Sequence, residues 1–337
     1  MSRHRQLGMT LVELMVGLLL ALIVVWVAGS LYVTNKQVTR VNDSISRLQE
    51  NGRFAMHVLE DDLRMAGFSG ICGNNVTTTN VLGSAAFPYQ FAIGIAGFHG
   101  TGASWSPALD ASISGLSPAP LPDRDVVTIR RFDASPVALT AAMSSPTDVL
   151  TVAAGSPLAA GDLLLVADCK AAAIFQATSY AGGVIGHAAS GTPGNTTTNL
   201  GRAFGTDASV YRLVTRTYFI APSARKPGSN SLWANSSPSY QGVAQPEELA
   251  EGVEQLFVRY GEDLDADRAA NRYVTAENVA AWDRVVSVRL QTLLATPSDS
   301  TTISPQPYTF NGVTTTPTDR RLRTPLASVI TLRNRAL

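Results

Sequence analysis

The stretch that decides the fold reads MSRHRQLG over residues 1–8 and MTLVE over residues 9–13, followed by an apolar run from Leu14 to Val33. The run carries no charge, and at about 1.5 Å per residue a helix of this length spans a hydrocarbon core of about 30 Å. Glu13 stands directly before it, although a carboxylate near a bilayer centre costs roughly 2.5–3.5 kcal/mol. The sequence therefore predicts a membrane-spanning helix with a charge that hydrophobicity does not explain.

Basic residues flank this run on both sides. Arg3, His4 and Arg5 precede it, and Lys36 and Arg40 follow it. Since positive charge near a span stays cytoplasmic, residues 1–8 are expected in the cytosol and the rest of the chain outside. An ordinary secretory signal cleaved near residues 28–30 is the alternative, because such signals have small residues at the cleavage site. That alternative leaves residues 8 and 13 unexplained.

The order of basic leader, Gly8, hydrophobic residue, Glu13 and apolar run resembles the class III signal of type IV pilins and pseudopilins. The resemblance implies cleavage after Gly8 by a prepilin peptidase, methylation of Met9 and assembly into a helical filament. Most members carry phenylalanine where this chain has Met9, and methionine is tolerated there. The resemblance also implies that Glu13 pairs with the N-terminal amine of a neighbouring subunit. A plain anchor with Glu13 at the headgroup interface is the alternative.

The helix is expected to continue well beyond the membrane, because no proline occurs before Pro88. Small and apolar residues recur at steps of three and four, which is the pattern of one buried helical stripe. Charged residues from Lys36 to Asp61 fill the other face. Gly67 is predicted as the C′ residue. These signals predict one helix from Thr10 to about Ala66, with the stripe Val38, Val41, Ile45, Leu48, Gly52, Ala55, Leu59, Leu63 and Ala66.

The composition favours an extracellular β-rich head. Net charge is zero, charged residues make up 15% of the chain, and about a quarter is usual. No specific nucleic-acid partner is implied by this balance. Cys72 and Cys169 both follow the span, and in an oxidising compartment such a pair is expected to form a disulfide. Two unrelated buried thiols are the alternative.

Short β-branched runs predict the strands of the head. Pro246 followed by acids predicts a short helix start, and residues 276–282 predict another short helix. Long loops are expected at about 73–122, 181–206, 222–246 and 296–324. The predicted class is α+β, with an antiparallel sheet packed on the helix. The expected strands are 125–132, 149–153, 162–169, 173–179, 209–221, 255–260, 284–295 and 327–334.

Four blocks of the head are similar to PilW-type minor pilins: residues 161–176, 248–273, 282–294 and 331–335. With the signal, the likeness covers most of the chain. It implies a type IV pilin-like fold with a leader at 1–8, an apolar helix at 9–35, its amphipathic continuation at 36–67 and a periplasmic head at 68–337.

The same resemblance implies a minor pilin of the type IV pilus. It implies an inner-membrane protein that joins other minor pilins to prime assembly, and that then lies in the extracellular pilus beside the major pilin. A place at the fibre tip with a PilY-type adhesin, twitching motility and adhesion are further implications. A J-type minor pseudopilin of type II secretion is the nearer alternative. A membrane-anchored periplasmic binding protein or enzyme is the more distant one.

One motif suggests a metal, and none suggests catalysis. Asp263, Asp265 and Asp267 have the spacing that opens a calcium loop, but Arg268 and Val274 occupy the positions where an EF-hand needs glycine and glutamate. With Asn271, the three aspartates define a candidate for a looser calcium site, and a solvated turn is the alternative. The four histidines form no HExxH pair, and neither a G-x-S-x-G elbow nor a P-loop occurs. We therefore expect no enzyme and no cofactor beyond a possible calcium ion.

Overall fold

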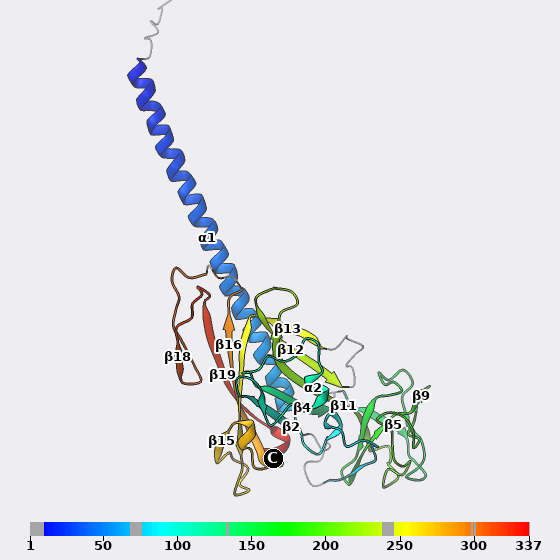
Figure 1. Cartoon of the computed structure of the whole chain (residues 1–337). Coiled ribbons are helices and arrows are strands. Elements are labelled where there is room, and N and C mark those ends of the chain that lie inside the picture. The colour runs from blue at the N-terminus through cyan, green and yellow to red at the C-terminus, as the bar shows by residue number, and fades with distance from the viewer. Residues whose placement is uncertain are drawn as a thin grey trace, which may run out of the picture.

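The computed structural model describes residues 10–67, 76–132, 135–237, 246–297, 299 and 301–336. Its first element, α1, is a continuous helix of 54 residues, Leu11–Arg64, with Thr10 as N-cap. Figure 1 shows that the first half of α1 stands clear of the head and the second half runs along it. The prediction of one unbroken helix, half apolar and half amphipathic, is confirmed.

The helix ends slightly earlier than predicted. Met65 is the C-cap, so Gly67 is not the C′ residue; it lies two positions beyond the cap, with a φ of 70°. That left-handed conformation suits glycine. The Gly67 amide donates to the carbonyl of Arg130, and the Arg130 amide donates to the carbonyl of Gly94. The end of α1 is thereby fixed against the sheet by backbone hydrogen bonds.

Replacing Gly94 by alanine is expected to destabilise the head, because a Cβ atom there would lie 2.4 Å from the Cα atom of Gly67. Backbone yields less easily than a side chain, so we expect a loss of about 1–3 kcal/mol, as for other overpacked sites. Gly29→Ala is the control, since a Cβ atom at that position meets nothing within 4 Å. Thermal unfolding of the two full-length variants measures the difference. Equal melting temperatures would contradict the prediction.

The larger of the two main sheets has 13 strands and is antiparallel except for the pair β1 and β8. Its strands are β1 (Thr77–Asn80), β2 (Ile95–Gly100), β3 (Trp105–Ser106), β4 (Val126–Phe132), β5 (Val137–Ala141), β6 (Leu150–Val152), β7 (Leu163–Ala167), β8 (Ala171–Gln176), β9 (Ser179–Ala181), β10 (Val184–Gly186), β11 (Ser209–Pro222), β12 (Asn230–Ser237) and β13 (Glu247–Glu251).

The second sheet has the order β15-β14-β16-β19, and a separate hairpin is formed by β17 and β18. The remaining elements are single turns of helix. The bounds are β14 (Val253–Glu262), β15 (Arg272–Val274), β16 (Val285–Ala295), β17 (Tyr308–Phe310), β18 (Val313–Thr315), β19 (Arg323–Thr331), α2 (Ala111–Ser114), α3 (Arg333–Ala336), η1 (Phe87–Tyr89), η3 (Ala276–Asn278) and η4 (Trp282–Arg284).

The long strand β11 joins two lobes of the head. Its first residues, Ser209 to Arg212, pair with β7, and its later residues pair with β4 and β12. Strands β5 to β10 form a side lobe with its own buried apolar cluster around Phe175 and Phe204. Figure 1 shows this side lobe projecting away from α1 near β5 and β9. The head therefore has two lobes: α1 packs on one of them, and the side lobe of β5 to β10 has a separate core.

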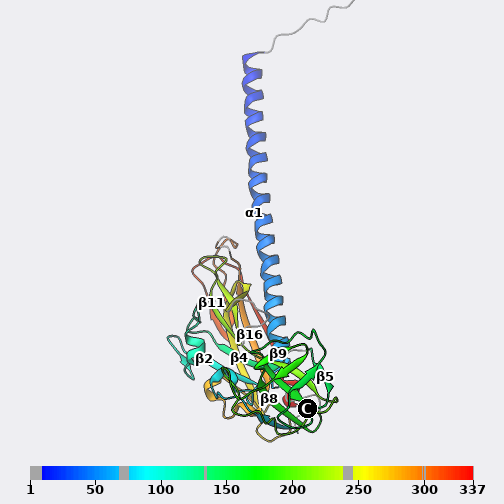
Figure 2. The same ribbon diagram turned by 90° about the vertical axis from the view of Figure 1, so that its right-hand side faces the viewer.

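The main core lies between the amphipathic half of α1 and the strands. Figure 2 shows α1 running along one side of the head. Burial of a large apolar side chain contributes about 1.5–3 kcal/mol, and three leucines of α1 are almost fully buried here. At Gly52 a Cβ atom would come within 2.3 Å of the Leu294 side chain, so helix and β16 approach closely. The predicted stripe is confirmed from Leu48 onward, with Leu48, Gly52, Ala55, Met56, Leu59, Asp62 and Leu63 buried within the helix.

Several predictions for the head were wrong. Residues 247–251, predicted to start a short helix, form β13, because Glu247 and Glu248 bind side chains of the neighbouring strands. Residues 276–282 hold only a 3₁₀ turn, η3, before η4 begins. The predicted loop 73–122 contains β1, β2 and β3, and the loop 222–246 contains β12. All eight predicted strands are present within a few residues of their expected bounds.

Candidate assembly site

The N-terminal end of α1 is closed by a reciprocal cap. The Glu13 amide donates to the Thr10 hydroxyl over 3.3 Å, and the Thr10 amide donates to Oε2 of Glu13 over 3.0 Å. Such a capping box satisfies two backbone donors of the first turn. Gly8 and Met9 lie outside the described residues, so the predictions of cleavage and methylation stay predictions. In the single chain, Glu13 is therefore hydrogen-bonded to Thr10, the residue that follows the predicted mature N-terminus, Met9.

The apolar half of α1 has no protein cover. Every residue from 10 to 40 is exposed, including Trp26, whose side chain is 76% exposed. Within the described residues, α1 is the one helix long and apolar enough to cross a membrane. An apolar surface of this size requires a cover, which for a helix is either lipid or other helices. The role of Glu13 in joining subunits remains a prediction.

A group of charged and polar side chains, which we call the helix–head cluster, is centred on the buried Asp62 and consists of Asp62, Arg131, Arg216, Tyr218 and Glu247. Asp62 on α1 lies 2.7 Å from Nε of Arg131 on β4 and 3.6 Å from Nη1 of Arg216 on β11. Arg216 also contacts Glu247 on β13 over 2.6 Å, and the Tyr218 hydroxyl donates to Asp62. The cluster therefore ties the helix to three strands.

Because the helix–head cluster is centred on a buried carboxylate, loss of one charged partner would leave another charge buried and unpaired. Asp62 is 5% exposed and Tyr218 is fully buried. Burial, and after it the Asp62 carboxylate, raises the pKa of Tyr218 well above its usual value, so the phenol keeps its proton and donates. The sequence reasoning missed Asp62, although it lies three residues after Leu59 and four before Ala66. Helical spacing alone places it on the buried stripe.

The candidate calcium residues lie in the loop between β14 and β15. Carboxylate oxygens of Asp263, Asp265 and Asp267 all lie within 4.8 Å of one another. Burial alone would raise the pKa of Asp263, but Asp263 accepts the amides of Ala266 and Arg268, and its hydrogen bonds together lower that pKa. The side-chain oxygen of Asn271 accepts the amide of Leu264, and its side-chain nitrogen donates to Oδ2 of Asp265. The loop brings all four predicted residues together, and calcium binding stays a prediction.

If this loop binds calcium, millimolar calcium is expected to raise the melting temperature of the full-length chain. Exposed carboxylates in a loose loop suit the weak extracellular range, with dissociation constants of about 10⁻⁴–10⁻³ M. The double variant Asp265→Asn/Asp267→Asn is expected to lose this shift, because it removes two anionic ligands. Magnesium at the same concentration is the control for ionic strength. No shift with calcium, or an equal shift with magnesium, would leave the solvated turn as the correct interpretation.

A second polar contact joins the two sheets. Nδ1 of His99 on β2 lies 2.7 Å from Oδ1 of Asp125, and Oδ2 of Asp125 accepts the amide of Val258 on β14. The hydrogen bond that His99 donates to the Asp125 carboxylate raises the pKa of His99, against the opposing effect of burial. Oδ1 of Asp125 also accepts the amide of Gly100, so this carboxylate links β2 to β14.

The raised pKa of His99 predicts a pH dependence of stability. A histidine whose pKa is higher in the folded state stabilises the fold fully below its unfolded value of about 6.5. This stabilisation is lost as the pH rises through the folded pKa. We therefore expect the unfolding midpoint in urea to fall as the pH rises above about 6.5, and His99→Gln to flatten that slope. His57→Gln, at a 70% exposed side chain, is the control and should keep the wild-type slope.

Several other histidine, glutamate and cysteine residues of the described chain also have side-chain partners. His57 forms a surface contact of 3.3 Å with Asp61. Four glutamates lie close together in the sequence at positions 247, 248, 251 and 254. Of these, Glu248 accepts the hydroxyls of Ser223 and Ser231, and Glu254 pairs with Arg323. Cys169 follows β7 and is disulfide-bonded. Its predicted partner, Cys72, lies outside the described residues, so the pairing stays a prediction.

Two family models match separate parts of the chain. Residues 3–29 match the prokaryotic N-terminal methylation motif, and residues 217–334 match the type IV pilus-assembly protein W. No curated protein matches the chain. A solved type IV-like pilin from Thermus thermophilus is similar with a TM-score of 0.36 and 12% identity, over 86% of this chain and 99% of that one. The second matched segment runs from the later part of β11 to α3, which is most of the lobe that packs on α1. With the methylation motif at its N-terminus and the pilus-assembly segment in its head, the chain carries both sequence features of a PilW-type minor pilin, as its resemblance to that family predicts.

Proposed function

We propose that the chain is cleaved after Gly8 by prepilin peptidase, methylated at Met9, and anchored in the inner membrane with its head in the periplasm. It then joins other minor pilins to prime assembly of the pilus, at the fibre tip. The observation that carries this proposal is the uncovered apolar half of α1, most of which lies within the methylation motif of residues 3–29. Lipid covers that surface before assembly, and neighbouring pilin helices cover it afterwards.

The division of α1 supports an assembly role rather than a simple anchor. Its second half is part of the core of the head and is tied to three strands by the helix–head cluster. A force on the apolar half is therefore transmitted to the head without a flexible linker. Glu13 acts at the junction between subunits, where its carboxylate pairs with the N-terminal amine of a neighbour. The heads then select the partners, among them the other minor pilins, the major pilin and a PilY-type adhesin.

Mass spectrometry of the mature N-terminus tests the processing step. The expected product begins with N-methylated Met9. A Gly8→Leu variant is the control, because a large side chain at the cleavage position is expected to leave the leader attached. A mature chain that begins near residue 31 would identify an ordinary secretory signal instead. An unprocessed chain in the membrane would favour the anchored binding protein or enzyme.

A deletion strain tests the cellular role. Loss of surface pili, twitching and adhesion, with secretion intact, is expected for a pilus protein. Loss of secretion with normal pili would identify the J-type minor pseudopilin of a type II system. PilW-type pilins are structural proteins, and Glu247, Glu248 and Glu254 each contact a side chain from another segment of the head. We therefore propose that the chain acts by assembly and not by catalysis.

A further inference from the structure

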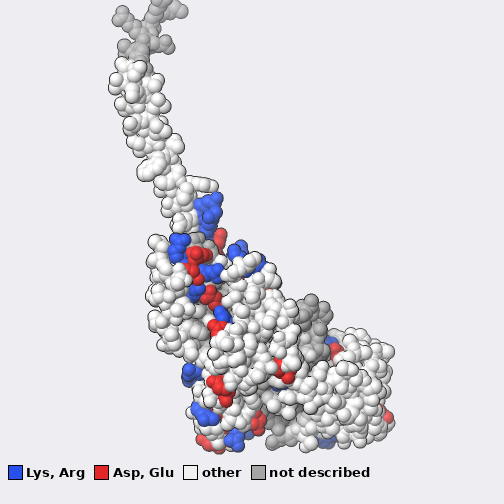
Figure 3. Space-filling view, in the orientation of Figure 1, with Lys and Arg blue, Asp and Glu red and all other residues white. Residues whose placement is uncertain are grey.

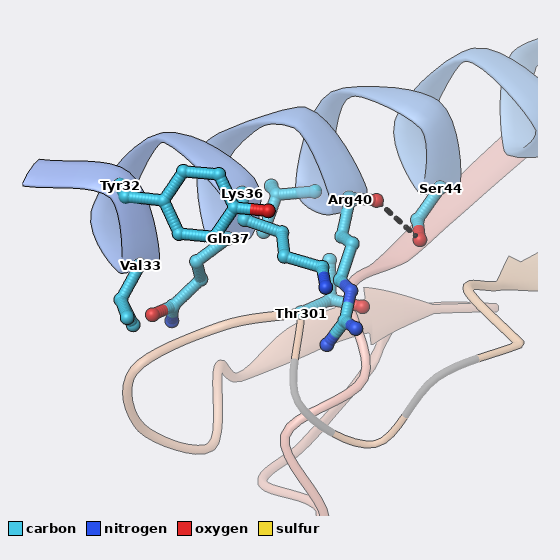
Figure 4. A pocket seen from close by; sticks show the side chains of 8 residues that line it. Tyr32, Val33, Lys36, Gln37, Arg40, Ser44 and Thr301 are labelled. Atoms are coloured by element: carbon cyan, nitrogen blue, oxygen red, sulfur yellow. Dashed lines mark hydrogen bonds between the residues drawn. The ribbon is translucent and has the colours of Figure 1, made fainter. Parts of the chain in front are cut away.

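A cavity lies where α1 leaves its apolar run, and we call it the basic cavity. It has a volume of about 480 Å³, within the range of about 300–1,000 Å³ that is usual for small-molecule sites. Figure 4 shows side chains of α1 pointing across it toward Thr301, which lies on the segment between β16 and β17. The lining residues are Tyr32, Val33, Lys36, Gln37, Arg40, Val41, Ser44 and Thr301.

Two cationic side chains share this cavity. Lys36 and Arg40 are one helical turn apart, and Figure 4 shows both reaching toward the same side of α1. Neither forms an ion pair with the carboxylates of the described residues, whereas Arg64 farther along α1 contacts both Glu60 and Asp61. Figure 3 shows blue surface where the white apolar helix meets the head. Two adjacent positive charges without a carboxylate favour an anion between them.

The depth of the cavity matches the headgroup layer of a membrane. The apolar run ends at Val33, and at about 1.5 Å per residue Lys36 lies about 5 Å and Arg40 about 10 Å beyond it along the helix. The headgroup regions add about 5–8 Å on each side of the hydrocarbon core. Tyr32 is 68% exposed at the same level, where aromatic side chains typically mark the interface. Lys36 therefore lies at the level of the lipid phosphates, and Arg40 lies just beyond it, with a long side chain that leans back toward the helix N-terminus and so toward the phosphates.

We propose that the basic cavity binds the phosphate of an anionic phospholipid in the leaflet on the side of the head. Lys36 and Arg40 contact the phosphate, and Tyr32 and Val33 line the side from which the acyl chains extend. The inference rests on the membrane anchoring given under Proposed function. It adds that the unassembled subunit binds anionic phospholipid where α1 enters the head.

The apolar part of the lining favours a lipid over an acidic side chain of a second pilin. Val33 is 64% exposed and lies in the same cavity as the two cations. A ligand that fills the site must therefore be anionic at one end and apolar at the other. A phospholipid has that division, and its acyl chains lie beside the apolar run by necessity. An aspartate or glutamate would leave Tyr32 and Val33 uncovered.

The test measures which lipid the full-length chain retains. The chain is inserted into vesicles that contain equal parts of phosphatidylglycerol and phosphatidylcholine and is extracted in detergent. Native mass spectrometry then identifies the lipid that stays bound when the detergent is removed in the gas phase. We expect retained phosphatidylglycerol, and about 30-fold weaker retention by Lys36→Gln/Arg40→Gln, from about 1 kcal/mol for each basic residue near an anionic surface. Arg47→Gln/Arg53→Gln removes two charges from the same helix and should retain the lipid. The charge-preserving variant Lys36→Arg/Arg40→Lys should also retain it.

Several results would overturn the inference. Equal retention of both lipids, or equal losses in the two glutamine variants, would show that no site at Lys36 and Arg40 selects an anionic lipid. Displacement of the lipid by millimolar inorganic phosphate would assign the cavity to a free anion. Unchanged retention with poor incorporation of Lys36→Gln/Arg40→Gln into pili would assign it to a partner pilin. Vesicle flotation keeps the two proposals apart, since a chain that fails to insert contradicts the membrane anchoring itself.

Discussion

Replacement of Asp62 by asparagine is expected to lower the free energy of unfolding of the full-length chain by about 3–5 kcal/mol, the cost of breaking a buried ion pair. Asp62 is the carboxylate of α1 that faces Arg131 and Arg216. Asparagine has nearly the same shape but no charge, so both guanidinium groups stay buried without that counter-charge. Urea unfolding in detergent, followed by tryptophan fluorescence, measures the change.

Asp61→Asn is the matched control for this substitution. Asp61 is the adjacent residue, but its side chain is 49% exposed and it contacts His57 and Arg64 at the surface. Exposed ion pairs contribute about 0–1 kcal/mol, so the control should unfold close to the wild type. Equal midpoints for the two variants would show that the helix–head cluster does not hold α1 to the head. A double variant, Asp62→Leu/Arg131→Met, should recover part of the loss, since apolar side chains often replace a buried pair at little cost.

The helix could be predicted from the sequence because its signals are local. Thr10 and Glu13 define a capping box, the apolar run has membrane length, and the later stripe has helical spacing. Gly67 marks the end within two residues. Each of these signals depends on residues a few positions apart, so no knowledge of the head is needed to recognise them.

The head was harder to predict because its strands depend on distant partners. Residues 246–251 carry the proline and acids of a helix start, yet Glu247 and Glu248 are drawn into strand pairing by Arg216, Ser223 and Ser231. Strand β12 is polar in sequence, and its burial comes from lying between β11 and β13. Tertiary pairing therefore decides these segments, and strand propensity does not.

Some residues of the candidate site could also be recognised from local sequence, whereas others depend on partners far away in the chain. Glu13 stands out in the sequence because a charge beside an apolar run is anomalous, and the four calcium candidates stand out by their spacing. Asp62 does not stand out, because it follows Asp61 in an ordinary amphipathic stretch. Its importance comes from Arg131 and Arg216, which are far away in the chain and arrive only through the sheet.

Replacement of Glu13 by alanine is expected to leave cleavage after Gly8 intact but to reduce incorporation into pili strongly. The proposed reason is that the carboxylate pairs with the N-terminal amine of a neighbouring subunit inside the apolar helical bundle. An amine left there without its partner is a buried unpaired charge, which costs about 3–5 kcal/mol and corresponds to a loss of more than 100-fold in an assembly equilibrium. Immunoblots of sheared pili and membranes measure the distribution of the variant.

The capping box offers a rival explanation for the same result, because Glu13 also bonds the Thr10 amide. Glu13→Gln separates the two, since glutamine can complete a capping box but carries no charge. Charge pairing predicts that Glu13→Gln assembles as poorly as Glu13→Ala, whereas Thr10→Ala, which removes the hydroxyl and keeps the carboxylate, assembles well. Capping predicts the reverse order, because loss of the Thr10 cap costs about 0.5–2 kcal/mol. Normal incorporation of Glu13→Gln would therefore contradict the pairing role and assign Glu13 to the start of the helix.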